Sequence, residues 1–189
     1  MINMTTQELV EKRVAILATD GVEQVELTEP WDVLKEHGAT VHIISIAPTG
    51  EEIQAVFGWS ELGDKFTVDK YVGEVKPDEY DLLLIPGGAW NPDFLRLSEE
   101  AISFIKRFAQ TGKPIASICH GPWTLIDAEL VKGKKVTSFP SIRKDLENAG
   151  ATWVDQEVIV DGNIITSRSP VDLTPFNEAI LNALKSHFK

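Results

Sequence analysis

The sequence has very little cysteine: a single residue, Cys119, among 189. A lone thiol cannot form a disulfide within the chain, which agrees with a reducing compartment and predicts a cytoplasmic protein. Long hydrophobic runs are also missing, since stretches such as Leu82–Ile85 and Ile115–Ile118 are far shorter than the ~20 residues needed to cross a bilayer. Residues Met1–Arg13 lack the unbroken apolar stretch of a secretory signal. We therefore expect neither a membrane-spanning helix nor export.

Positive charge is scarce as well. The chain has 18 Lys and Arg against 29 Asp and Glu, a net charge of −11 and a pI near 4.8. Such a chain repels phosphate backbones and anionic lipid surfaces, so we expect no nucleic-acid and no membrane partner. His37, His42 and His187 are scattered without the spacing of metal ligands, which predicts no metal site. No cofactor is expected.

The remaining composition is that of an ordinary globular protein, with 43% hydrophobic and 25% charged residues, and the length fits one domain over residues 1–189. Short β-branched runs alternate with helical segments, which predicts the α/β class with a mostly parallel sheet covered on both faces. The expected strands cover 13–19, 40–47, 80–86, 114–119 and 135–138, with a hairpin at 157–160 and 163–166. The expected helices cover 23–37, 98–111 and 142–149, with others opening at 120–123 and 169–170. Pro30 predicts a kink or a late start in the first helix, and residues 48–70 are interpreted as a β excursion from the main sheet.

Cys119 occupies the junction between an expected strand and an expected helix, with His120 next to it. A nucleophile at such a junction is lifted out of the sheet and lies near the positive end of the helix dipole. Both effects favour the thiolate, so we predict a reactive cysteine with a lowered pKa. The ordinary alternative is an inert buried cysteine, but the following His-Gly-Pro favours the reactive one.

Other strand ends carry residue types that fit the same site. Glu23 follows the first strand, and a protonated carboxyl there could hydrogen-bond the sulfur. The backbone N–H of His120, with one from the Gly87-Gly88 turn, could form an oxyanion hole. Trp90 and Trp123 flank the site and are predicted to wall its mouth. Taken singly, each has an ordinary structural explanation; together they place active-site residue types at three strand ends.

The segment Ala116-Ser-Ile-Cys-His-Gly-Pro-Trp123 resembles the signature of the PfpI-type intracellular proteases. These are relatives of the parkinsonism-associated deglycase within the class I glutamine amidotransferase-like superfamily. Further stretches along the chain carry the same resemblance: Gly21–Leu27, Leu84–Gly88, Asn91–Asp93 with Leu95-Arg96, Thr137–Ile142, and Ser167–Pro170 with Asp172-Leu173.

The resemblance implies a flavodoxin-like three-layer sandwich that forms homodimers or larger homo-oligomers. It implies Cys119 as nucleophile, His120 as its partner, Glu23 beside the sulfur and Gly88 as an oxyanion-hole amide. In protease-like members an acidic residue of a neighbouring subunit orients the histidine, and Asp93 matches that position. This chain departs from the family there, because it has Asp where the best-known protease has Glu and the loop length differs by one residue.

The activities attributed to the family differ, so the function is predicted by its chemistry. A cysteine-dependent hydrolase of carbonyl or glycated substrates is favoured, as a stress-protective protein deglycase or a glyoxalase-like enzyme, because a thiolate adds readily to an electrophilic carbonyl carbon. Small carbonyls, glycated proteins or peptides are the expected substrates. The alternative is an intracellular cysteine peptidase active as an oligomer, which needs a well-oriented His120. A redox sensor or a holdase chaperone is an alternative of another class, although no second cysteine exists to resolve an oxidised thiol.

Overall fold

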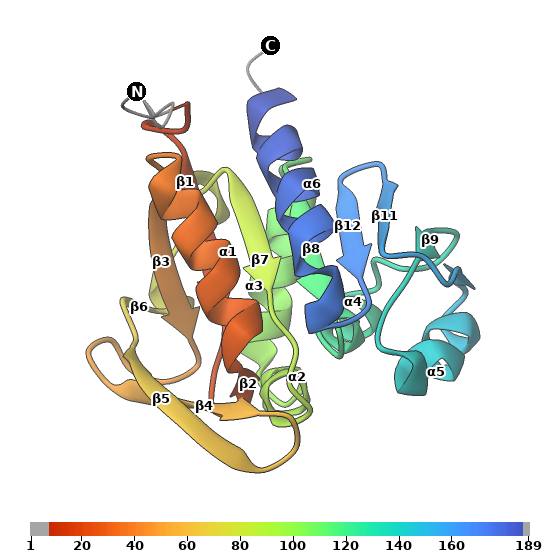
Figure 1. The fold of residues 1–189 in the computed structure, drawn as a ribbon, viewed down its shortest axis with the longest axis horizontal. Helices are drawn as coiled ribbons and strands as arrows, with labels where there is room; N and C mark the ends of the chain where they lie inside the picture. The colour runs from red at the N-terminus through yellow and green to blue at the C-terminus, as the bar shows by residue number, and fades with distance from the viewer. Residues whose placement is uncertain (1–7, 187–189) are drawn as a thin grey trace.

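In the computed structural model the described residues are 8–186, and they form a sheet between two layers of helices (Figure 1). Met1–Gln7, which belong to the segment Met1–Arg13 that is predicted to lack a secretory signal, and His187 lie outside the described residues. The central sheet has 7 strands in the order β11-β12-β8-β7-β1-β3-β6. All neighbours are parallel except β11 and β12, which form an antiparallel hairpin.

The strands of the central sheet are short and apolar. Their bounds are β1 Arg13–Leu17, β3 Thr40–Ser45, β6 Lys70–Tyr71, β7 Leu82–Ile85, β8 Ile115–Ile118, β11 Val158–Asp161 and β12 Ile164–Ser167. Every residue of β7, β8 and β12 is buried, as expected for central parallel strands covered on both faces. Alternate residues of β1, β3, β7, β8 and β12 enter two separate hydrophobic clusters, one on each face of the sheet.

Helices cover both faces. The helices are α1 Gln24–Glu36, α2 Trp90–Arg96, α3 Glu99–Gln110, α4 Pro122–Asp127, α5 Arg143–Asn148 and α6 Leu173–Ser186. The first cluster joins α1 and α6 to one face, and the second joins α3, α4 and α5 to the other. Figure 1 shows α1 and α6 side by side in front of the sheet, with α3 behind it. The fold is the expected flavodoxin-like α/β sandwich.

The carboxyl ends of the parallel strands carry the irregular elements. The segment after β3 forms the expected β excursion: β4 Glu52–Phe57 and β5 Glu61–Thr67 are antiparallel, and β4 also pairs with β2 Val22–Glu23. Figure 1 shows this hairpin at the same end of the molecule as α2. A second small sheet pairs β9 Lys135–Val136 with β10 Thr152–Trp153.

Most predicted elements agree with the structure within a few residues. Of the two effects predicted for Pro30, the late start is wrong, because α1 begins at Gln24 and contains Pro30, and the kink stays a prediction. Helix α2 and the small β9–β10 sheet were not predicted. None of the helices within residues 8–186 has the length and apolar character required to cross a membrane.

Candidate active site

Cys119 lies on a strained turn between β8 and α4. Its φ of 64° is in the left-handed region, which non-glycine residues rarely adopt and which is enriched at functional sites. The turn is held by backbone hydrogen bonds from Cys119 to the Ser167 carbonyl, 3.1 Å, and from Phe139 to the Cys119 carbonyl, 2.9 Å. A Cβ at Gly121 would collide with the Ser117 hydroxyl and the Ile85 carbonyl, so only glycine fits there. The predicted sharp junction is confirmed.

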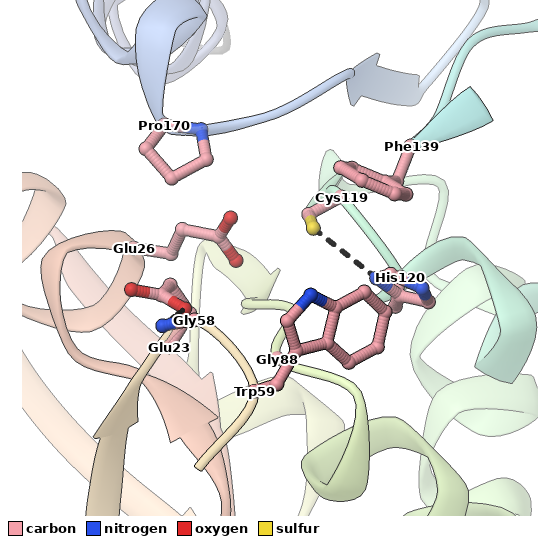
Figure 2. Close-up of a pocket in the computed structure, with 9 residues that line it drawn as sticks. All are labelled: Glu23, Glu26, Gly58, Trp59, Gly88, Cys119, His120, Phe139 and Pro170. Carbon is pink, nitrogen blue, oxygen red and sulfur yellow. Dashed lines mark hydrogen bonds between the residues drawn. The ribbon is translucent and has the colours of Figure 1, made fainter. Parts of the chain in front are cut away.

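The sulfur faces a pocket of about 310 Å³ at the carboxyl edge of the sheet (Figure 2). Cys119 is 6% exposed. The lining residues come from α1 and its start, the β4–β5 turn, the ends of β7 and β8, and the segments after β9 and β12. They are Glu23, Glu26, Gly58, Trp59, Gly88, Cys119, His120, Phe139 and Pro170.

Glu26, rather than the predicted Glu23, lies beside the sulfur. Figure 2 shows the Glu26 carboxyl pointing toward Cys119, and its Oε2 accepts a hydrogen bond from the Gly87 N–H at 2.6 Å. Oε1 is buried and has no hydrogen-bond partner among the described residues. Burial raises the pKa of Glu26 to about 8, so at neutral pH this carboxyl carries a proton. A proton on Oε1 makes this oxygen a hydrogen-bond donor on a carboxyl that points toward Cys119.

The surrounding protein does not lower the pKa of the Cys119 thiol. Burial raises the pKa of Cys119, and Glu26 raises it further once that carboxyl is ionised, while hydrogen bonds from the N–H groups of Gly88 and His120 lower it. The prediction of a lowered pKa is therefore wrong, because α4 has only 6 residues and the sulfur is buried next to a carboxyl. The two N–H groups predicted to form an oxyanion hole do converge on the sulfur.

His120 is positioned to take the thiol proton. Its Nδ1 lies 3.3 Å from Cys119 Sγ, and its Nε2 lies 3.2 Å from the Ser141 hydroxyl. Burial lowers the pKa of His120, so the imidazole is neutral at pH 7. Phe139 stacks on the ring with centroids 4.8 Å apart, and Trp59 meets it edge-on at 5.9 Å. Among the described residues no carboxylate hydrogen-bonds the ring.

Glu23 has a different position from the one predicted. It is half-buried at the N-cap of α1, and its Oε2 accepts the Gly58 N–H at 2.9 Å. Burial raises the pKa of Glu23 and the Gly58 hydrogen bond lowers it. Glu23 therefore ties the β4–β5 turn to the start of α1 and lies at the pocket wall, not at the sulfur.

The prediction that two tryptophans wall the mouth of the pocket is also wrong. Neither Trp90 nor Trp123 lines the pocket, whose aromatic walls are Trp59 and Phe139. Trp123 packs against the His120 ring at 5.3 Å and donates from Nε1 to Asp145. Trp90, in the first turn of α2, packs against Gly21.

Asp93 is exposed on α2 and is not among the residues that line the pocket. Its predicted role concerns a neighbouring subunit, so this chain alone leaves that role a prediction. Within residues 8–186 no group of three His, Cys, Asp or Glu side chains is arranged to hold a metal ion.

Three residues that sequence reasoning missed are Glu26, Trp59 and Ser141. A signal existed for Glu26: it falls with Leu27, Pro30 and Leu34 on the buried stripe of α1, where a carboxylate is out of place. No local pattern singles out Trp59, because a turn between two peripheral strands reaches His120 only in the folded chain.

Comparisons with known proteins found relatives of this chain by sequence and by structure. A family model described as DJ-1/PfpI family matches residues 12–183. The chain is 44% identical to "Putative cysteine protease YraA" of Bacillus subtilis and 42% identical to Deglycase TK1284 of Thermococcus kodakarensis, covering 92% of this chain and 99% of the relative in both cases. It also matches the crystal structure of a two-domain protein of Anabaena variabilis, with DJ-1/ThiJ/PfpI-like and ferritin-like domains. That match has a TM-score of 0.85 and 37% identity over 92% of this chain and 48% of the other.

Proposed function

This chain belongs to the DJ-1/PfpI family, and we propose that it is a cysteine-dependent hydrolase that acts on carbonyl adducts, as a deglycase or glyoxalase-like enzyme. The observation that carries the proposal is the set of groups around one sulfur. Cys119 has a neutral imidazole at 3.3 Å, a protonated carboxyl beside it, and the N–H groups of Gly88 and His120 directed at it.

The protonation states suit addition to a carbonyl carbon. Because the thiol keeps its proton in the free protein, His120 Nδ1 accepts that proton as the sulfur attacks. The protonated Glu26 and the two backbone N–H groups then stabilise the negative charge that develops in the pocket. This arrangement avoids a permanent thiolate in a buried site that contains a second acid.

The reaction on an aldehyde adduct of an amine, R–NH–CH(OH)–C(=O)–CH₃, balances with one water. The sulfur forms a bond to the CH(OH) carbon, and the amine leaves with the proton that His120 accepted. The C–H proton of that carbon is then removed while the ketone oxygen gains a proton, which gives an enediol. A proton added to the former ketone carbon, and one lost from the hydroxyl of the sulfur-bearing carbon, convert the enediol into a thioester next to an alcohol. Water cleaves the thioester, which restores the thiol and releases a 2-hydroxy acid. No outside oxidant or reductant is required.

A cysteine peptidase is the second candidate, because the Cys119–His120 contact is the pair that such an enzyme requires. Amide cleavage must also protonate a poor leaving group, which demands a third group to orient the imidazolium. In this chain the Nε2 partner is the Ser141 hydroxyl, and a carboxylate must come from Asp93 of another copy in a homodimer or larger homo-oligomer. We therefore place the peptidase second. The lone thiol supports a cytoplasmic location for either activity.

The test is turnover of methylglyoxal and of a methylglyoxal-modified peptide, beside an unmodified fluorogenic peptide, by wild type and Cys119→Ser at matched concentration. We expect 2-hydroxy acid release by wild type only, with little cleavage of the unmodified peptide. Peptide cleavage that needs Cys119 would favour the peptidase instead. Absence of all turnover would leave a redox sensor or a holdase, which are separated by whether the protection of an aggregating client protein survives Cys119→Ser.

A further inference from the structure

The pocket in front of Cys119 lacks positive charge. Its nine lining residues include two carboxyl groups and no Lys or Arg, and its one imidazole is neutral at pH 7 because burial lowers the His120 pKa. The whole chain carries a net charge of −11. An anionic substrate therefore meets a repulsive field at the mouth, whereas a cationic one is attracted.

The nearest cation along the lining segments is fully engaged elsewhere. Arg168 precedes the pocket residue Pro170 by two positions, but its guanidinium binds Asp172 through Nε and Nη2 and Asp155 through Nη1. These three hydrogen bonds, at 2.8 to 3.0 Å, join the guanidinium to two carboxylates that neutralise its charge. Arg168 thus fixes the segment that carries Pro170 without contributing an anion site to the pocket.

Glu23 offers an acceptor at the pocket wall. One of its oxygens receives the Gly58 N–H, which favours the ionised form, and the other has no hydrogen-bond partner among the described residues. Glu26 lies deeper and is protonated at neutral pH, so the carboxyl that can carry negative charge at the pocket wall is Glu23, whose pKa is raised by burial and partly restored by the Gly58 hydrogen bond. Figure 2 shows the two carboxyls on one side of the pocket and Cys119, His120 and Trp59 on the other.

Trp59 provides the aromatic surface that complements this charge. It follows Gly58 in the β4–β5 turn, is 64% exposed, and lines the pocket while meeting the His120 ring edge-on. A carboxylate and an exposed indole on opposite walls are the combination that binds quaternary ammonium and guanidinium groups. The Glu23–Gly58 hydrogen bond sets the spacing between the two walls, because it joins the residues that precede α1 and Trp59.

We propose that the mouth of the Cys119 pocket binds a positively charged group, such as a quaternary ammonium or a guanidinium, carried beside the reacting carbon of the substrate. Glu23 and Trp59 are the residues that determine this specificity. The assignment rests on the proposed function in one respect, that the Cys119 pocket is the substrate site. It predicts that cationic carriers of a reactive carbon are accepted and anionic carriers are rejected.

The single cysteine allows a test that requires no turnover. Two methanethiosulfonate reagents of similar size transfer either a trimethylammonioethyl or a sulfonatoethyl group: the thiolate attacks the sulfenyl sulfur, a mixed disulfide forms and methanesulfinate leaves. The labelling rate of Cys119 with each reagent is measured by intact mass and divided by the rate with free cysteine under the same conditions. We expect the cationic reagent to be favoured by about tenfold after this correction, the effect of one charge acting at close range.

The variants assign the preference to residues. Glu23→Gln is expected to lower the cationic preference several-fold, whereas Glu178→Gln, an exposed carboxylate on α6, changes the net charge equally and leaves it unchanged. Trp59→Leu is expected to slow the cationic reagent without slowing the anionic one. In wild type the preference should fall as salt rises, since screening weakens charge attraction at an open mouth. This salt dependence is measured on the wild-type protein, so it tests the proposal even if a variant fails to fold.

Equal corrected rates in wild type, labelling by neither reagent, or a preference that salt leaves unchanged would overturn the proposal. A preference unaffected by Glu23→Gln would remove Glu23 from it, and an equal effect of Trp59→Leu on both reagents would make Trp59 a steric cover only. The outcome is independent of the turnover experiment. Failure of the proposed function leaves the labelling preference in place, and failure of the preference leaves Cys119-dependent turnover in place.

Discussion

Glu26 is the residue whose chemistry the fold alters most. Glu26 is fully buried next to the Cys119 thiol, and this site disfavours a negative charge on both groups at once. The two groups therefore hold at least one proton between them at neutral pH. The Gly87 N–H donates to one carboxyl oxygen of Glu26. Only glycine fits at position 87, because a Cβ there would overlap Glu26 Oε2 and Cys119 Cβ. The acid and the nucleophile are thus in contact because the turn after β7 is glycine.

This burial predicts a pH dependence of stability. The pKa of Glu26 is raised from 4.5 to about 8 in the folded protein. Between these values the folded state holds a proton that the unfolded state has lost, so the contribution of Glu26 to stability is fully present below about pH 4.5 and is lost as pH rises toward 8. At ~1.4 kcal/mol per unit of pKa, the loss is on the order of 5 kcal/mol. We expect Glu26→Gln to flatten the dependence of the urea midpoint on pH between 5 and 8.

The control for this prediction is Glu23→Gln, since Glu23 is only half-buried and the Gly58 N–H hydrogen bond offsets part of the rise in its pKa that burial causes. It should leave most of the slope intact. A wild-type protein whose stability is constant across this range would show that Glu26 is ionised when folded.

The same pair of residues shows what the sequence predicts at the residue scale. Cys119 and His120 are adjacent and follow a buried strand, so their place is readable from local pattern. To choose between Glu23 and Glu26, the residue at which α1 begins must be known. That residue decides which of the two carboxylates, three positions apart, faces the sheet. Trp59 reaches His120 only through the pairing of β2, β4 and β5, which local pattern does not encode.

At the scale of elements, the junction between β8 and α4 is the most constrained connection. Cys119 adopts a φ of 64°, and Gly121 adopts a φ of −50° that any residue tolerates. Gly121 is needed for space, since its missing Cβ leaves room for Ser117 and for the ends of β7 and β8. The sequence predicted this junction because β8 and its neighbours are continuous apolar runs that end in Cys-His-Gly-Pro. It missed α2, a short helix that buries the polar Asn91 while its apolar Phe94 is exposed, so its apolar residues do not mark its buried side.

Gly121→Ala is expected to destabilise the protein by about 2 kcal/mol or more, because overpacking of a closed site forces backbone or side-chain shifts. It should also change the alkylation rate of Cys119 by iodoacetamide, since the turn that presents the sulfur must move. Chemical denaturation and intact mass measure the two effects.

Gly112→Ala is the matched comparison. Gly112 has a φ of 74° and open space around it, so alanine there costs about 1–2 kcal/mol of backbone strain and nothing in packing. Cys119 should react at the wild-type rate in that variant. Equal effects of the two substitutions on Cys119 reactivity would contradict the crowding argument.

At the scale of the whole molecule, the topology brings the chemistry together. The parallel strands β1, β7, β8 and β12 all end at one edge, and the segments that follow them supply Glu26, Gly88, Cys119 and Pro170 to one pocket. Short apolar strands separated by helices already predict this gathering from the sequence. What a second copy of the chain would add is not encoded in that pattern, because the His120 ring is held by Ser141 and aromatic side chains within one chain.

That distinction leads to different concentration dependences for the two candidate activities. Addition of Cys119 to a carbonyl uses groups of one chain, so we expect the rate of methylglyoxal turnover per subunit to be constant on dilution. The proposed peptidase needs Asp93 of another copy, so its rate per subunit should fall once the protein is diluted below the dissociation constant of the oligomer. Asp93→Asn at high concentration should match the diluted wild type in peptide cleavage and leave carbonyl turnover intact. Peptide cleavage that is independent of both dilution and Asp93, or absent at every concentration, would remove the trans carboxylate from the mechanism and leave the single-chain site as the whole catalytic apparatus.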